Sequence, residues 1–161
     1  MNPEYPGVRA VLTGGLAATI VLTVLMYAAP LAGFPAIDMA SAIGGFVGHP
    51  ALLFTSRWWM GMVVFLLVGI VFSPLLFVGM SRILYGSGWL RGLEWGVLLW
   101  SAGAVCVMAY LGLAFHPPFT THPQLSALSS FLGNAIYGAV LGAVSMPPAA
   151  LRQRALPSAP A

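Results

Sequence analysis

Long apolar runs divide the chain into four segments, separated by shorter connections that contain polar residues, glycine and proline. The runs cover residues 10–29, 58–80, 93–115 and 125–146. Each exceeds the roughly 18 residues that mark a helix able to cross a bilayer. The pattern predicts an all-α membrane protein: a bundle of four transmembrane helices within residues 1–148, followed by an Ala- and Pro-rich tail at 149–161.

Proline residues mark the expected ends of these helices. Pro30 and Pro35 follow the first run, and Pro147 and Pro148 follow the fourth. Proline removes a backbone donor and clashes with the preceding turn, so it ends or bends a helix. Pro74 lies inside the second run and predicts a kink near the end of that helix.

The connection at residues 31–57 is the longest in the chain, and it is not uniformly polar. Its apolar residues recur at three- and four-residue steps: Ile37, Ala40, Ile43, Phe46 and Val47. This spacing favours a short amphipathic segment that lies at the membrane interface. A partly re-entrant segment is the alternative.

Composition and charge support a membrane location and indicate its topology. Of the 161 residues, 60% are apolar and 6% are charged, whereas soluble domains carry about 25% charged residues. Five arginines flank the predicted helices on one side (Arg9, Arg82, Arg91, Arg152 and Arg154), and Arg57 alone lies on the other. The positive-inside rule therefore places both termini in the cytoplasm. Arginines scattered in this way indicate topology, so we expect lipids and integral membrane subunits as partners, and no nucleic acid.

Small and aromatic residues suggest how the helices are held. Glycines four residues apart allow close backbone approach between membrane helices, and they occur at Gly138 and Gly142 and at Gly92 and Gly96, with Gly14 on the first helix. These faces would pack the four helices together or dock them on a neighbouring protein. Tryptophans near helix ends (Trp58, Trp59, Trp89 and Trp95) are typical of interfacial anchors.

Ionisable residues are missing from the middle of the predicted helices. The nearest is Glu94, about one turn into the third run, where we expect it to pair with Arg91 at the helix N-terminus. Membrane proteins that catalyse reactions or move protons generally keep ionisable groups at membrane depth. The sequence therefore predicts no catalytic residues and no activity of its own.

The residues that could bind a metal or a cofactor lie on the predicted outer face. Asp38, His49, His116 and His122 all fall there and could bind zinc or copper, or supply an axial ligand to haem. Each histidine precedes a proline, and residues before proline are pushed toward extended conformations. The favoured interpretation is a stiff loop that contacts another subunit, with no intrinsic cofactor; the metal or haem site is the alternative.

Several stretches together resemble an uncharacterised family of small four-helix bacterial inner-membrane proteins. The resemblance spans residues 10–116 and rests on these stretches: Gly14-Gly15-Leu-Ala-Ala-Thr19, Met26-Tyr-Ala-Ala-Pro30, Phe34-Pro35-Ala-Ile-Asp38, His49, and the run from Gly88 to Trp100. Members of that family are sometimes associated with respiratory terminal oxidases. The resemblance implies an association with electron-transport complexes and no catalytic residue.

These observations lead to an expected function and two alternatives. We expect a non-catalytic accessory subunit of a larger membrane complex, such as a respiratory oxidase or a related electron-transfer assembly. The alternatives are an outer-face metal- or haem-binding protein and a small transporter or channel. A transporter needs a polar path, but hydrogen bonds between helices would explain the polar residues inside the runs, namely Thr13, Thr19, Thr23, Ser101 and Asn134.

Overall fold

A computed structural model describes residues 6–35, 38–47, 57–104 and 122–146, and all regular structure in these ranges is helical. Six α-helices are found there: α1 (Val8–Ala28), α2 (Met39–Val47), α3 (Arg57–Leu67), α4 (Ser73–Met80), α5 (Gly88–Ala102) and α7 (Pro123–Ser145). Two short segments extend them: the 3₁₀ turn η1 (Ala29–Ala32) after α1, and the π-helical turn η2 (Val68–Phe72) between α3 and α4. The prediction of an all-helical protein is confirmed for the described residues.

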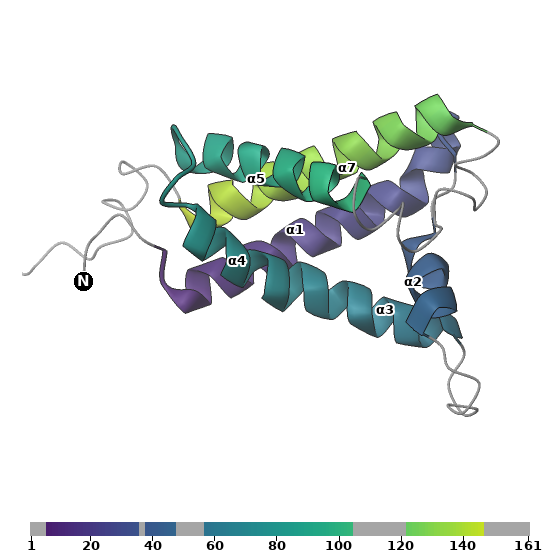
Figure 1. Ribbon diagram of the computed structural model, residues 1–161, viewed down its shortest axis with the longest axis horizontal. Helices are drawn as coiled ribbons and strands as arrows, with labels where there is room; N and C mark the ends of the chain where they lie inside the picture. Colours follow the sequence, from purple (N-terminus) through teal and green to yellow (C-terminus); the bar gives the residue numbers. More distant parts are fainter. Residues whose placement is uncertain (1–5, 36–37, 48–56, 105–121, 147–161) are drawn as a thin grey trace, which may run out of the picture.

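The helices are arranged around α1. Helices α5 and α7 lie side by side, and α1 crosses between this pair and the rod formed by α3, η2 and α4 (Figure 1). Helix α2 packs against α3, at the end of the rod remote from α4 (Figure 1). Contacts of α1 with both α7 and η2 therefore join the two sides of the molecule.

Three helices in the described ranges are long and apolar enough to cross a membrane: Val8–Ala32, Trp58–Met80 and Pro123–Ser145. They correspond to the first, second and fourth predicted spans. The third predicted span, residues 93–115, is described only as far as residue 104, and its remainder lies outside the described residues. The structure therefore supports a membrane protein, with three helices in the described part of the chain that are long and apolar enough to span a bilayer.

Two helix ends differ from the prediction by three or more residues. The first helical path does not end before Pro30, because Pro30 lies in the first turn of η1, where its missing N–H group leaves no helical hydrogen bond unmade. It ends instead at Gly33, whose positive φ of 84° suits glycine. Helix α5 begins at Gly88, five residues before the predicted start at 93, although Arg91 then lies within the helix. The expected boundary was wrong because apolarity defines a membrane span, whereas the helix also includes residues outside the apolar run.

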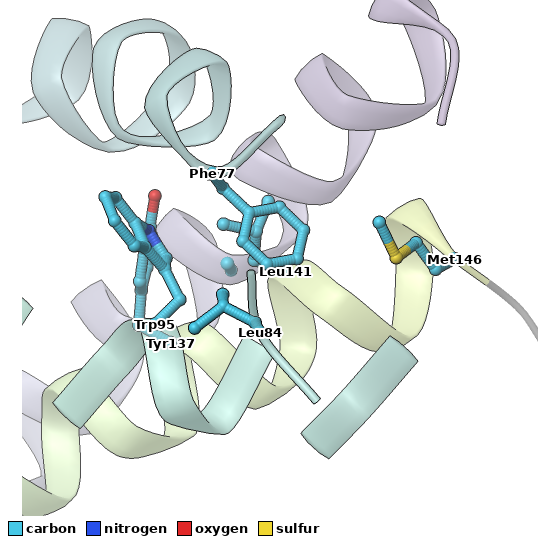
Figure 2. Close-up of a cluster of buried hydrophobic side chains, with 7 residues drawn as sticks. Phe77, Leu84, Trp95, Tyr137, Leu141 and Met146 are labelled. Carbon is cyan, nitrogen blue, oxygen red and sulfur yellow. The ribbon is translucent and has the colours of Figure 1, made fainter. Parts of the chain in front are cut away.

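A cluster of buried hydrophobic side chains lies where α4, α5 and α7 meet α1. Its members come from all four helices and the α4–α5 connection: Ala18, Phe77, Leu84, Trp95, Tyr137, Leu141 and Met146. Figure 2 shows Trp95 and Tyr137 next to one another on one flank of Phe77, with Met146 on the other. The ring centroids of Phe77 and Trp95 are 6.3 Å apart, within the range of favourable aromatic pairs.

Candidate ligand cavity beside a π-helical turn

The π-helical turn η2 follows from the position of Pro74. Proline has no N–H group and its ring would clash with the carbonyl of residue i−4, which here is Ile70. The helix widens just before Pro74, so that the N–H of Ser73 donates to the oxygen of Val68, five residues earlier. Widening of this kind is a recognised way for a helix to absorb a disturbance, and it is frequent at functional sites.

This widening leaves the carbonyl of Gly69 without a donor from its own helix. Its normal partner, the N–H of Ser73, donates to Val68, and Pro74 has no N–H to offer. The hydroxyl of Tyr137 on α7 fills the gap and donates to the Gly69 oxygen over 2.6 Å. In a membrane a freed backbone carbonyl must find a partner within the protein, so Tyr137 compensates directly for the proline.

A second hydrogen bond ties α5 to the same region. Trp95 is 6% exposed, and its indole Nε1–H donates to Ser73 Oγ over 3.1 Å. The prediction that Trp95 is an interfacial anchor is therefore wrong: its ring is buried in the core. By contrast, the exposed fraction is 58% for Trp59 and 50% for Trp89.

On the other side of η2, α1 approaches closely at two adjacent positions. Gly15 lies against Pro74 and the Ile70 carbonyl, where a Cβ atom would collide with the proline ring. One turn later, Thr19 faces Gly69, and a Cβ added to Gly69 would lie 2.5 Å from Thr19 Oγ1. Thr19 is 1% exposed, and its hydroxyl has no hydrogen-bond partner. A buried hydroxyl left without a partner destabilises a protein by about 1–3 kcal/mol.

A cavity of about 550 Å³ begins at this point and extends toward α2. Its volume falls in the range of roughly 300–1,000 Å³ that small-molecule sites occupy. All six described α-helices and the turns η1 and η2 contribute to its walls, α4 through Ser73 and α5 through Leu99. Along α1 and the turn η1 that follows it, the lining runs from Thr19 to Ala32. The portion on α1 itself, up to Ala28, covers nine residue steps or roughly 14 Å at 1.5 Å per residue.

The two ends of the cavity differ in polarity. Thr19, Ser73, Asn134 and Tyr137 line it near η2, and Ser129 and Ser130 line it about one turn before Asn134 on α7. The end near α2 is lined by apolar residues, namely Phe34, Pro35, Met39 and Ile43. Among the described lining residues there is no Asp, Glu, Lys, Arg or His. The arrangement can hold an elongated, largely apolar molecule with an uncharged polar group at one end.

Helices α5 and α7, which both contribute to the cavity, contact each other directly through their backbones. A Cβ atom on Gly92 would collide with the carbonyl of Gly138, and one on Gly142 with the carbonyl of Gly88. Gly96 is equally close to the carbonyl of Asn134. These glycines therefore make contacts within the chain. Gly14 also lies against α7, next to Leu141 and Ser145.

A known protein family matches the part of the chain that contains all of these helices. The model of a family of unknown function, DUF6789, matches residues 6–154. The chain belongs to this family. The result agrees with the resemblance to an uncharacterised family, and it assigns no activity. No curated protein and no solved structure matches the chain.

In this DUF6789 protein, two of the four predicted outer-face ligands can be placed. Asp38 precedes α2 and caps it: its carboxylate accepts hydrogen bonds from Ser41 N–H (3.0 Å) and Ser41 Oγ (2.7 Å). His122 is exposed immediately before α7, and its backbone carbonyl accepts the Ser126 N–H over 2.9 Å. His49 and His116 lie outside the described residues. Within the described ranges, no group of three or more His, Cys, Asp or Glu side chains could hold a metal.

Glu94 plays a different part from the one predicted. Its Oε2 accepts a hydrogen bond from the backbone N–H of Tyr85, over 3.0 Å, in the connection between α4 and α5. No ion pair joins Glu94 to Arg91, both of which are described, and the buried Nε of Arg91 has no partner. The carboxylate therefore fixes the turn that returns the chain from α4 to α5.

The polar residues within the helices also bond differently from the prediction. Most donate to the carbonyl four residues earlier in their own helix: Thr13 to Arg9, Thr23 to Thr19, Ser101 to Val97 and Asn134 to Ser130. Such local bonds are common for hydroxyl side chains in helices. The hydrogen bonds between helices come instead from Tyr137, from Trp95 with Ser73, and from Ser145, whose Oγ donates to the Ala10 carbonyl over 3.5 Å. In the sequence, the feature that points to the first two of these hydrogen bonds is the Ser73-Pro74 pair inside an apolar run.

Proposed function

We propose that the protein is a non-catalytic accessory subunit of a larger membrane complex, with a respiratory oxidase or a related electron-transfer assembly as the expected host. We further propose that residues 93–115 form a fourth span in a bacterial inner membrane, with both termini cytoplasmic. The observation that carries the accessory role is how little of each spanning helix is covered by the rest of the chain.

Each of the three spanning helices presents a broad apolar face to its surroundings. In their most apolar stretches, between 22% and 28% of the residues are buried inside the protein. Exposed apolar side chains recur at helical spacing, as at Ile20 and Val24 on α1 and at Phe72 and Leu76 on the η2–α4 segment. Lipid can cover such faces, and so can the helices of another subunit.

The packing inside the chain supports a structural role on these faces. The glycine contacts of α5 and α7 and the bonds of Tyr137 and Trp95 hold the helices together from within. The internal contacts do not use the outer faces of α1, α3 and α4. A bundle built in this way can attach to a neighbour without unfolding its own core.

The test is site-specific photocrosslinking in native membranes. A photoreactive phenylalanine analogue replaces Ile20 on α1, Leu76 on α4 or Leu128 on α7, each of which is exposed. We expect one of the three positions to give a discrete adduct with a single membrane protein, which mass spectrometry identifies. The other two positions serve as matched lipid-facing controls. If all three react with lipid alone, and the chain migrates alone on native gels, the accessory role is wrong.

A further inference from the structure

We propose that the cavity between α1, η2 and α7 is a binding site for an uncharged lipid with a carbonyl-bearing head group. The head lies near η2, beside Thr19, Ser73 and Asn134, and the apolar chain of the lipid runs toward α2. This site is separate from the outer faces that carry the accessory role, and it stands whether or not the chain joins a complex.

The shape of the cavity fits a chain-bearing molecule. The lining on α1 extends from Thr19 past the end of the helix, and Met26, Phe34 and Met39 line the part toward α2. Methionine and aromatic side chains adapt well to flexible apolar ligands. The walls therefore match a linear hydrocarbon chain, apart from the hydroxyls of Ser129 and Ser130, which lie about one turn before Asn134 on α7.

The electrostatics of the walls exclude a charged head group. The polar side chains at the η2 end, Thr19, Ser73, Asn134 and Tyr137, are all uncharged in their ordinary state. A phosphate or carboxylate buried there would lose its hydration without gaining a counter-ion, which is strongly unfavourable. The polarity is also opposite to that of a bilayer phospholipid, since the polar end lies beside η2, within the second spanning helix.

The hydrogen-bonding capacity near η2 favours a head group that accepts. The Thr19 hydroxyl is unpaired in the wall of the cavity. Threonine in a helix divides between two χ1 rotamers, so this hydroxyl can turn from Gly69 toward a ligand. Asn134 gives one N–H to the Ser130 carbonyl, over 2.9 Å, and an amide nitrogen carries a second. Two donors on facing helices thus suit a carbonyl oxygen.

The test is titration of the purified full chain in detergent, followed by native mass spectrometry. The probes are decylubiquinone and monoolein, two uncharged lipids whose carbonyl heads come from different sources. Dioleoylphosphatidylglycerol, which is anionic, and hexadecane, which has no head group, serve as ligand controls. We expect saturable one-to-one binding of at least one of the two probes, and at least tenfold weaker binding of both ligand controls.

Two substitutions connect this binding to the site. Thr19→Val and Asn134→Leu each remove a donor with little change in volume, and each should weaken probe binding roughly five- to tenfold, as expected for one hydrogen bond. Thr23→Val is the matched control. The Thr23 hydroxyl, on the same helix, already donates to the Thr19 carbonyl over 2.7 Å. The affinity of the Thr23→Val variant for the probe should therefore stay within about twofold of that of the unaltered chain.

The outcomes separate clearly. Binding of decylubiquinone alone, of monoolein alone, or of both supports the proposal and identifies the source of the head group. Equal binding of hexadecane overturns it, because the head group would then contribute nothing. Equal binding of the anionic phospholipid also overturns it, because the site would then not exclude a charged head group. Unchanged affinity in both donor variants also overturns it. Circular dichroism and thermal unfolding of each variant show that the comparison is made between folded proteins.

Discussion

The contact between α5 and α7 and the contact between α1 and η2 both depend on glycine, but they are built differently. In the first, backbone meets backbone: Gly88, Gly92 and Gly96 face Gly138, Gly142 and the Asn134 carbonyl. In the second, side chains take part: Gly69 faces the Thr19 side chain, and Gly15 faces the Pro74 ring as well as the Ile70 carbonyl. The first contact is rigid, because backbone atoms cannot move aside. In the second, a side chain such as Thr19 can change its rotamer, and a cavity lies beside it.

The difference arises from the proline. Glycines four residues apart on two regular helices allow a long, close approach, and α5 and α7 are regular where they meet. The rod of α3, η2 and α4 is interrupted by Pro74, so its backbone is widened and one carbonyl turns to Tyr137. A polar, adjustable region in the membrane interior is the result.

The largest effect is expected where the packing is rigid. In Gly142→Ala, the new Cβ atom would collide with the Gly88 carbonyl and crowd Gly92, both of which belong to the backbone of α5. Neither can move without separating the helices, so we expect a destabilisation of roughly 3 kcal/mol. Unfolding of the detergent-solubilised protein in increasing sodium dodecyl sulfate measures it.

Gly79→Ala provides the matched control for this substitution. Gly79 lies in α4, and a Cβ atom there would meet nothing within 4 Å. Alanine favours the helix over glycine by about 0.5–1 kcal/mol, so this variant should be as stable as the unaltered chain or slightly more stable. If both substitutions destabilised the protein equally, the loss in Gly142→Ala would not come from the α5–α7 contact.

A smaller, repairable effect is expected in the adjustable region. Gly69→Ala brings a Cβ atom against the Thr19 side chain, and we expect it to destabilise the fold by about 1–2 kcal/mol. Thr19→Ala in the same chain removes the obstructing atoms and should restore most of that loss. The interaction energy from a double-mutant cycle measures this coupling. Strictly additive losses would contradict the contact.

The α5–α7 contact illustrates how far the sequence alone could lead. The spacing of Gly92, Gly96, Gly138 and Gly142 predicts close packing, since such spacing has a direct geometric meaning. It leaves open whether the partner helix belongs to the same chain. That answer depends on which faces meet after folding, and a single sequence does not contain it.

The cavity region was harder to anticipate, for a physical reason. Pro74 predicted a disturbance in its helix, but whether the helix kinks or widens depends on the groups that can satisfy the freed carbonyl. Here the group is Tyr137, 68 residues away from Gly69. The local positions of Trp95 and Thr19 likewise do not determine their environments, which neighbouring helices set. Polar contacts between distant segments have no local pattern.

The smallest effect tests this compensation for the proline. Tyr137→Phe keeps the ring, which is 3% exposed in the core, and removes the hydroxyl that donates to Gly69. Hydrogen bonds between membrane helices contribute about 0.6 kcal/mol on average, and the loss here should reach about 1 kcal/mol, because a backbone carbonyl is left unpaired. Tyr27→Phe, at a side chain 53% exposed on α1, is the control and should change stability little. Hydrogen exchange should speed up around η2 in the first variant only; no change there would mean that the widened turn holds without Tyr137.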